Sequence, residues 1–268
     1  PLTISAGQTN LTGSATPNGG VILSTSQLKN PDILVDVRDK SVLAPVGVPL
    51  EIMREEVLRC SNNTLYYPVD PTSRHDAYVG GTLSCNASGF IPGEKGATRY
   101  WVKEIELILI NGYSLTIKRG DYISNNGEFI IKCDDKTIVM PIPKYKRPEI
   151  KNASGPFSSM NSEIDFIDLI IGSEGIFGMI TQCVFGLDIK PPNHLELFLR
   201  LEDENKAIAL HQFLYTEFDG DMSEVTALEY FGYNCQTYMK NKEFLFNNEQ
   251  EVGLYVQIPI YNDDIDLK

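Results

Sequence analysis

The sequence predicts an α+β chain with mixed sheets, and two observations carry this fold class. Short apolar or alternating runs typical of strands recur along all 268 residues, separated by Gly, Pro, Asn and Asp. Amphipathic helical spacing, in contrast, occurs in only a few segments, one of them near the start of the chain. Residues 195–260 then alternate strand-like and helix-like segments, as ferredoxin-like α+β domains do.

The start of the chain predicts four short strands and one helix. The strands are expected at residues 2–5, 21–24, 33–37 and 41–45. Residues 49–60 follow as an amphipathic helix, because Leu50, Met53, Val57 and Leu58 fall on one face and Pro49 suits the first turn.

The middle of the chain predicts two hairpins. Asn111-Gly112 between β-rich runs is a strong signal for the first, and residues 128–133 and 137–140 form the second. Residues 141–162, rich in Pro, Lys, Ser and Asn, predict a mobile surface loop. A short helix at 162–170 and a strand at 177–189 complete this part.

Pro191-Pro192 predicts a domain boundary, which gives one domain at residues 1–190 and a second at 191–268. In the second domain, strands are expected at 195–201, 224–230 and 252–260, with helices at 205–217 and 232–240. This β-α-β-α-β series predicts a ferredoxin-like domain that stops before it is complete.

Composition excludes several functions. A net charge of -13 argues against nucleic acid and anionic lipid as partners. No apolar run is long enough to span a bilayer, and no secretory signal is visible. The five cysteines form no CxxC pair, which predicts reduced thiols in a cytoplasmic protein. The three histidines have no metal-ligand spacing, so no metal is expected.

Three stretches rich in glycine and small polar residues carry the functional signal. They are residues 6–14 (AGQTNLTGS), 68–89 (PVDPTSRHDAYVGGTLSCNASG) and 170–181 (IIGSEGIFGMIT). Such stretches let backbone amides approach a large anionic ligand, for example a pyrophosphate. The alternative is that they are ordinary polar loops. G-x-G-x-x-G, P-loop, G-x-S-x-G and H-E-x-x-H motifs are all missing, which disfavours the sites they mark.

In this order the three stretches resemble the FAD-binding domain of the vanillyl-alcohol oxidase/PCMH flavoprotein superfamily, and most of all its FAD-linked oxidase branch. The resemblance covers residues 1–190, while residues 195–260 resemble the start of that family's cap domain. It implies a PCMH-type fold whose N-terminal lobe and remaining cap lie outside these residues. Gln8 stands where members with covalent flavin have histidine, so non-covalent FAD is expected.

The resemblance also implies which residues bind the cofactor. Residues 7–14 would form a first pyrophosphate loop, residues 68–70 would approach the isoalloxazine, residues 80–89 would form a second cradle, and residues 174–180 would hold the adenine end. The implied cofactor-binding residues are Gly7, Gln8, Thr9, Asn10, Leu11, Gly13, Ser14, Pro68, Val69, Asp70, Gly80, Gly81, Thr82, Asn86, Ala87, Gly89, Glu174, Gly175 and Ile180. Structural alternatives stay open: turn glycines at Gly13 and Gly81, a helix cap at Glu174 and a core residue at Ile180.

The function implied by the resemblance is an FAD-dependent oxidoreductase. The flavin would take a hydride from a small 2-hydroxy acid such as D-lactate, glycolate or D-2-hydroxyglutarate and pass the electrons to an acceptor. The alternatives are a flavin-dependent transferase similar to alkyl-dihydroxyacetonephosphate synthase, and an inert acidic module of the same fold. The residues identify no catalytic base, substrate, electron acceptor or oligomeric state.

Overall fold

The structure is a computed structural model that describes residues 1–133, 136–142 and 163–261. Most of the predicted surface loop, residues 143–162, therefore lies outside the described residues. The chain divides into two compact units, which are described separately. Residues 1–89 and 97–190 form the first, and residues 90–96 and 191–268 form the second.

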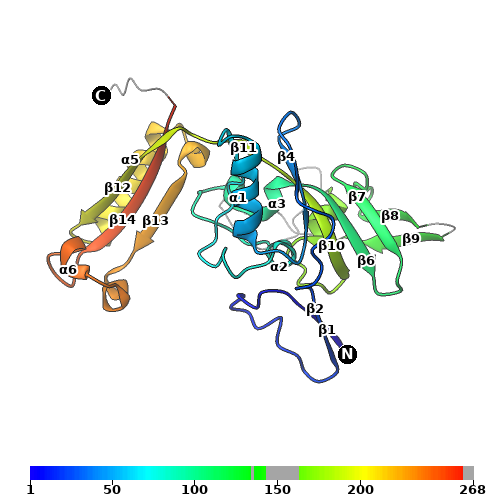
Figure 1. The fold of residues 1–268 in the computed structure, drawn as a ribbon. Helices are drawn as coiled ribbons and strands as arrows, with labels where there is room; N and C mark the ends of the chain where they lie inside the picture. The colour runs from blue at the N-terminus through cyan, green and yellow to red at the C-terminus, as the bar shows by residue number, and fades with distance from the viewer. Residues whose placement is uncertain (134–135, 143–162, 262–268) are drawn as a thin grey trace. The chain divides into compact units, whose positions relative to one another are not determined.

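The first unit is built on a five-stranded antiparallel sheet (Figure 1). Its order is β3 (Leu34–Asp36), β4 (Ser41–Pro45), β10 (Gly178–Gly186), β6 (Val102–Leu109) and β7 (Ser114–Lys118). The central strand, β10, comes from late in the chain and pairs with β4 on one side and β6 on the other. Val42, Ile105 and Phe185 from these strands are fully buried, so the core lies against this sheet.

Helix α1 (Leu50–Cys60) is the longest helix described in the first unit. Leu50, Met53 and Val57 are fully buried, which confirms the predicted apolar face. Three shorter helices are α2 (Val79–Ser84), α3 (Thr98–Trp101) and α4 (Phe166–Ile170). Asp165 caps α4, because its side chain accepts a hydrogen bond from the backbone N–H of Ile167.

Three two-stranded sheets complete the first unit. They are the parallel pair β1 (Leu2–Ser5) and β2 (Val21–Ser24), the pair β5 (Leu65–Tyr66) and β11 (Asp188–Ile189), and the hairpin β8 (Glu128–Cys133) and β9 (Lys136–Pro141). The predicted strands at 2–5, 21–24 and 41–45 and both hairpins are confirmed.

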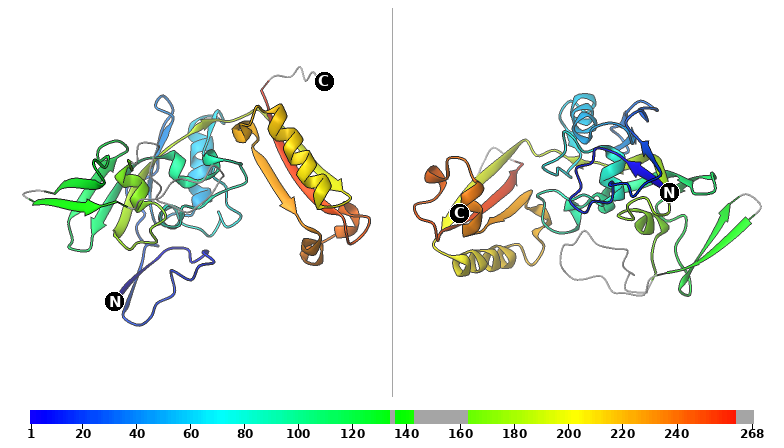
Figure 2. Two further views of the ribbon diagram at one scale, coloured as in Figure 1. Left: turned by 180° about the vertical axis from the view of Figure 1, so that it is seen from behind. Right: turned by 90° about the horizontal axis from the view of Figure 1, so that it is seen from below.

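The second unit is a three-stranded antiparallel sheet with one long helix. The strand order is β12 (Asn193–Leu201), β14 (Val252–Ile260) and β13 (Ala227–Phe231). Helix α5 (Glu204–Glu217) lies along one face of this sheet (Figure 2). Leu210 and Leu214 of α5 pack on a small core that includes Leu254 and Val256 of β14.

The predicted helix at 232–240 is wrong. Tyr233–Tyr238 is a 3₁₀ segment, and a single turn, α6 (Lys242–Leu245), follows it. Asn241 in between has a left-handed backbone (φ 57°), which ends any continuous helix. β13 and β14 are consequently antiparallel neighbours, and the unit reads β-α-β-β. The predicted mixed α and β class is nevertheless confirmed for the chain.

Short 3₁₀ segments also lie at Glu94–Gly96 and Met222–Glu224. Among the residues described, none of the helices combines the length and the apolar character needed to cross a bilayer.

Candidate functional site

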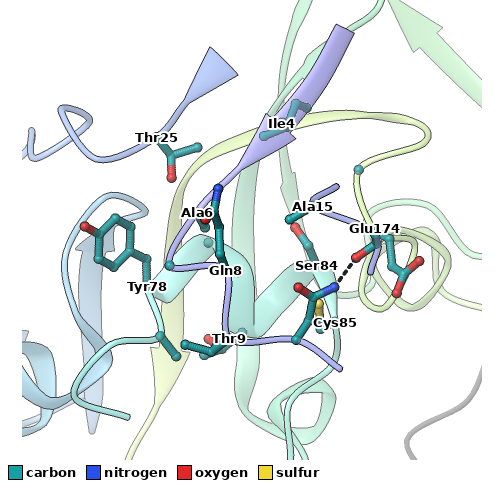
Figure 3. Close-up of a pocket in the computed structure, with 18 of the residues that line it drawn as sticks. Ile4, Ala6, Gln8, Thr9, Ala15, Thr25, Tyr78, Ser84, Cys85 and Glu174 are labelled. Carbon is teal, nitrogen blue, oxygen red and sulfur yellow. Dashed lines mark hydrogen bonds between the residues drawn. The ribbon is translucent and has the colours of Figure 1, made fainter. Parts of the chain in front are cut away.

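The three glycine-rich stretches meet at one cleft in the first unit (Figure 3). Figure 3 shows side chains from all three, among them Thr9, Cys85 and Glu174, gathered around it. The predicted residues that line this cleft are Gly7, Gln8, Thr9, Asn10, Ser14, Gly80, Gly81, Thr82, Ala87, Glu174, Gly175 and Ile180. These predicted residues therefore share one cleft, and their roles toward a ligand stay a prediction.

The first loop, residues 6–15, connects β1 toward β2 and carries unpaired backbone donors. No amide from Gly7 to Thr12 has a hydrogen-bond acceptor within the part of the chain that the structure describes. Gln8 adopts a left-handed backbone (φ 57°), and its side-chain Nε2 donates to Ser5 Oγ at 2.9 Å. A half-buried loop with unsatisfied N–H groups is suited to an anionic ligand that accepts them.

Gly7 sets the path of this loop. A Cβ at position 7 would collide with the backbone carbonyl of Asp76, so only glycine lets the first loop approach the segment before α2 this closely. Ala6 lies beside Gly81 in the same way, since a Cβ at Gly81 would be 3.2 Å from the Ala6 Cβ.

Helix α2 lines the cleft, and backbone hydrogen bonds to the segment directly after β4 hold it in place. Val79 N–H donates to the carbonyl of Val48 at 2.9 Å, and Gly80 N–H donates to that of Val46 at 3.0 Å. A Cβ at Gly80 would lie 2.7 Å from the Val46 Cβ, so the glycine permits close packing. The Gly80 amide is consequently occupied and is not free for a ligand.

The third loop, residues 171–178, is docked on the end of α2. Gly172 N–H donates to the Leu83 carbonyl at 3.0 Å, and Glu174 N–H donates to the Ser84 carbonyl at 2.8 Å. Glu174 makes this turn with a left-handed backbone (φ 54°), which is costly for a residue with a side chain. The amides of Gly172 and Glu174 are thus bonded to protein carbonyls.

Arg99 fastens the third loop from behind. Its guanidinium donates to the backbone carbonyls of Asp168 and Ile171, the latter at 2.7 Å. The backbone N–H of Arg99 donates to Oδ1 of Asn86 at 2.9 Å. Arg119 adds a fork of 3.1 Å bonds to the Asp168 carboxylate. One network therefore holds the end of α2 and the third loop together.

The electrostatics of the cleft are unusual for an anion site. No Lys or Arg is among its lining residues in the described ranges, and the single acidic side chain is Glu174. Thr12 Oγ1 donates to Oε1 of Glu174 at 2.9 Å, which links the first and third loops. Burial, and next the Glu174 carboxylate, raise the pKa of the Cys85 thiol that faces the same space. Backbone amides are the donors that remain for a phosphate.

Several predicted site residues lie outside the cleft. Val69 is fully buried in the core, Asn86 is buried with its side chain bonded to Arg99, and Leu11 is fully exposed. A Cβ at Gly89 would collide with Asp70, so this glycine serves close packing. The predicted residues that do not line the cleft are Leu11, Gly13, Pro68, Val69, Asp70, Asn86 and Gly89.

The cleft also has walls that the prediction did not name. These are Ile4, Ala6, Ala15, Thr25, Ser73, Ala77, Tyr78, Ser84, Cys85, Gly178 and Met179. Most lie inside or next to the glycine-rich stretches, so proximity in sequence could have found them. Thr25 could not be found this way, because it reaches the cleft only through the pairing of β1 with β2.

Metal chemistry has no candidate in the described ranges, where no three His, Cys, Asp or Glu side chains are grouped to hold an ion.

Comparison with known proteins shows what this part of the chain is similar to. Residues 1–118 match the family described as FAD binding domain. The match includes the first loop and α2 of the cleft, and the third loop lies beyond it.

Curated relatives agree with this family. Over 198 residues, 74% of the chain, it is 28% identical to a D-2-hydroxyglutarate dehydrogenase of Xanthomonas citri pv. viticola (strain LMG 965 / NCPPB 2475 / ICMP 3867 / CFBP 7660). Over 208 residues, 77% of the chain, it is 24% identical to the glycolate oxidase subunit GlcD of Bacillus subtilis (strain 168). The chain spans 34% and 36% of these two relatives.

The fold is similar to that of a solved alkyldihydroxyacetonephosphate synthase. The TM-score is 0.66 at 16% identity, with 96% of this chain and 42% of that chain covered. This likeness concerns the fold alone.

The residues present fit an FAD pyrophosphate. Its two phosphates carry one negative charge each and need several donors, and the unpaired amides of Gly7 to Asn10, which line the cleft, are such donors. Gln8 leaves no histidine for a covalent flavin bond at that position.

Proposed function

We propose that the protein of which this chain is part is an FAD-dependent oxidoreductase acting on a small 2-hydroxy acid such as D-2-hydroxyglutarate, D-lactate or glycolate. The observation that carries the proposal is a cleft with unpaired amides inside an FAD-binding domain whose relatives carry hydroxy-acid dehydrogenase and oxidase names. The bound flavin supplies hydride acceptance, and the acid leaves as its 2-oxo product.

In this proposal the chain's own residues bind and orient the cofactor. The amides of Gly7, Thr9 and Asn10 donate to the pyrophosphate, and Gly80 and Gly81 allow it to approach α2. Glu174, Gly175 and Ile180 receive the adenosine half. Binding is non-covalent, and an electron acceptor reoxidises the flavin.

The proposal also extends to partners and location. The net charge of -13 supports the proposal that nucleic acid is not a partner of this protein. Cys60 and Cys235 are exposed free thiols, which supports a reducing compartment such as the cytoplasm.

Cysteine protection tests where FAD binds. Cys85 lines the cleft, whereas Cys60 and Cys235 are exposed elsewhere. FAD should slow the alkylation of Cys85 at least tenfold and leave the other two unchanged, as measured by mass spectrometry. Because the pKa of Cys85 is raised, the thiolate forms at alkaline pH, and the experiment belongs near pH 9. An alkylation rate of Cys85 that is the same with and without FAD would show that FAD does not bind in this cleft.

Flavin chemistry tests the reaction. Visible absorption bands that are released intact by heat would establish non-covalent FAD. D-2-hydroxyglutarate, D-lactate and glycolate should then bleach the flavin anaerobically, and an artificial acceptor should restore it. Bound FAD that none of these acids reduces would contradict the oxidoreductase and favour a flavin-dependent transferase. Failure to bind FAD at all would favour an inert module.

A further inference from the structure

The segment that precedes helix α2, residues 67–77, is attached to the first turn of helix α1. Leu50 N–H donates to the Ala77 carbonyl at 2.8 Å, and Glu51 N–H donates to the Arg74 carbonyl at 3.1 Å. The N-cap residue of α1 makes no side-chain capping bond. Because the first N–H groups of a helix have no partner inside it, these two carbonyls take the place of a cap. The helix and the segment therefore hold each other.

A cluster of three charged side chains adds to this attachment. Oε2 of Glu51 accepts a hydrogen bond from Arg54 Nη1 at 2.8 Å and lies 2.9 Å from Arg74 Nε. Arg54 Nε also donates to the Tyr67 carbonyl at 3.3 Å. One carboxylate thus connects to the segment at two places, directly at Arg74 and through Arg54 at Tyr67.

The cluster is better suited to fix geometry than to add stability. The side chains of Glu51, Arg54 and Arg74 are 19%, 18% and 32% exposed. The cost of taking such charges out of water offsets most of their attraction, so a partly buried ion pair is weak evidence for stability. Removing one partner, in contrast, leaves the others in a wrong environment and lets them move.

The segment held in this way forms one side of the cleft. Ser73 and Ala77 line it. The Asp76 carbonyl lies so close to Gly7 that a Cβ there would collide with it. Close-packed contacts transmit strain, so a shift of the segment also moves the first loop. The amides of Gly7 to Asn10, which have no acceptor among the described residues, would move with that loop.

We propose that Glu51 is a positioning residue for cofactor binding: acting through Arg54 and Arg74, its carboxylate sets where residues 67–77 lie and thereby where the first loop presents its amides. The inference rests on the proposed FAD site. None of the three side chains is among the described residues that line the cleft, so the effect is indirect. Its physical basis is preorganisation, because donors already in place for a ligand need no ordering when it binds.

The test is a double-mutant cycle on the complete chain, with FAD affinity measured by fluorescence titration. Glu51→Gln keeps the shape and the backbone bond, and Arg74→Gln removes the partner charge. Each should weaken FAD binding at least fivefold. Because both break the same pair, the double variant should bind no more than twofold more weakly than the weaker single variant, whereas independent sites would give about 25-fold in total. Arg54→Lys cannot reach both Glu51 and the Tyr67 carbonyl and should also weaken binding.

Glu56→Gln is the matched control, because Glu56 and Arg59 form a pair with the same three-residue spacing farther along α1. It should leave FAD affinity unchanged. Urea unfolding without FAD separates positioning from stability. A lower unfolding midpoint with unchanged FAD affinity in Glu51→Gln would overturn the inference, because it would show a merely structural role.

Two further outcomes are decisive. Losses of affinity that multiply in the double variant would also overturn the inference, while the FAD site stands. If Glu51→Gln does not fold, Arg74→Gln and Arg54→Lys decide: weaker FAD binding in both supports the inference, and unchanged binding in both overturns it. Absence of FAD binding to the native chain would instead overturn the proposed function itself, and the inference with it.

Discussion

The first and third loops line the same cleft but are held in opposite ways. From Gly7 to Thr12 the first loop has no amide bonded to a protein acceptor in the described residues. In the third loop, the amides of Gly172 and Glu174 donate to carbonyls of α2, and Arg99 donates to the Ile171 carbonyl. Protein acceptors therefore fix the third loop at Gly172 and Glu174, whereas the amides of the first loop are available to a ligand.

The two loops are therefore suited to contribute to ligand binding in different ways. A preformed wall fixes the direction of the ligand at little entropic cost, and a wall with free donors supplies most of the binding to phosphate. FAD should thus order the first loop and stabilise the first unit by mass action. The first three of the following variants act on one wall or on the bond between the two walls, and the last variant touches neither.

The largest effect is expected from Arg99→Ala, which removes the support of the third loop. Hydrogen bonds from a charged donor contribute about 1.5–3 kcal/mol, so the free energy of unfolding of the first unit should fall by about 2–3 kcal/mol. Urea unfolding checks this. Arg99→Lys keeps the charge but not the fork and should be intermediate. Arg59→Ala, on the exposed face of α1, is the control. An equal loss of unfolding free energy in both variants would contradict the role of Arg99.

Gly7→Ala should act on the first loop alone. The new Cβ would collide with the Asp76 carbonyl, and overpacking of this kind costs about 1–3 kcal/mol. Because the loop can move away, we expect FAD affinity to fall about 10–100-fold, as measured by fluorescence titration. Gly19→Ala is the control: position 19 has open space around it, so the variant has only the strain of its positive φ, which Gly7 lacks. Unchanged affinity in Gly7→Ala would show that the loop position is irrelevant to FAD.

Thr12→Val removes the one side-chain bond described between the two loops. The lost Thr12–Glu174 bond is exposed and should be worth about 0.5–1 kcal/mol. FAD should then dissociate about 2–5-fold faster in stopped-flow measurements, with stability unchanged. Thr16→Val, in the connection that follows, should leave the rate as it is. An identical rate in Thr12→Val would mean that the loops move independently.

The smallest effect is expected from Glu56→Gln on α1, which touches neither wall. Arg59 lowers the pKa of Glu56 to about 2. A lowered folded-state pKa gives stability that is present above the unfolded value near 4.5 and lost as pH falls toward 2. Since the pair is largely solvated, the variant should lose only a few tenths of a kcal/mol near pH 7. A difference from the native protein that persists unchanged at pH 2.5 would contradict this assignment.

Sequence patterns predicted those parts of the fold that local chemistry decides. Helix α1 followed from Leu50, Met53 and Val57, and the hairpin from Asn111-Gly112. Helix α2 was not predicted, because Gly80 and Gly81 are poor helix formers and tertiary bonds to Val46 and Val48 hold it. The predicted helix at 232–240 was wrong, because residues 233–238 form a 3₁₀ segment instead of an α-helix.

The cleft was predictable in place but not in detail. Glycine-rich stretches marked where the backbone comes close to a ligand, and Gly7, Gly80 and Gly175 do line it. Val69 and Asn86 do not line the cleft, because Val69 is buried in the core and the Asn86 side chain bonds to Arg99; their roles toward FAD stay a prediction. Burial depends on the whole sheet, so a short motif cannot reveal it.

The division of the chain into units has a consequence for its biosynthesis. Residues 90–96 belong to the second unit, where the Phe90 carbonyl accepts from Leu228 N–H. Leu228 leaves the ribosome well over a hundred residues later, roughly 7 to 28 s at typical elongation rates. Behind this segment the first unit closes through the Ser88–Ala97 bridge and the bond from Thr98 N–H to the Ala87 carbonyl. During synthesis, residues 90–96 therefore lack the hydrogen bond from Leu228 until that residue has emerged.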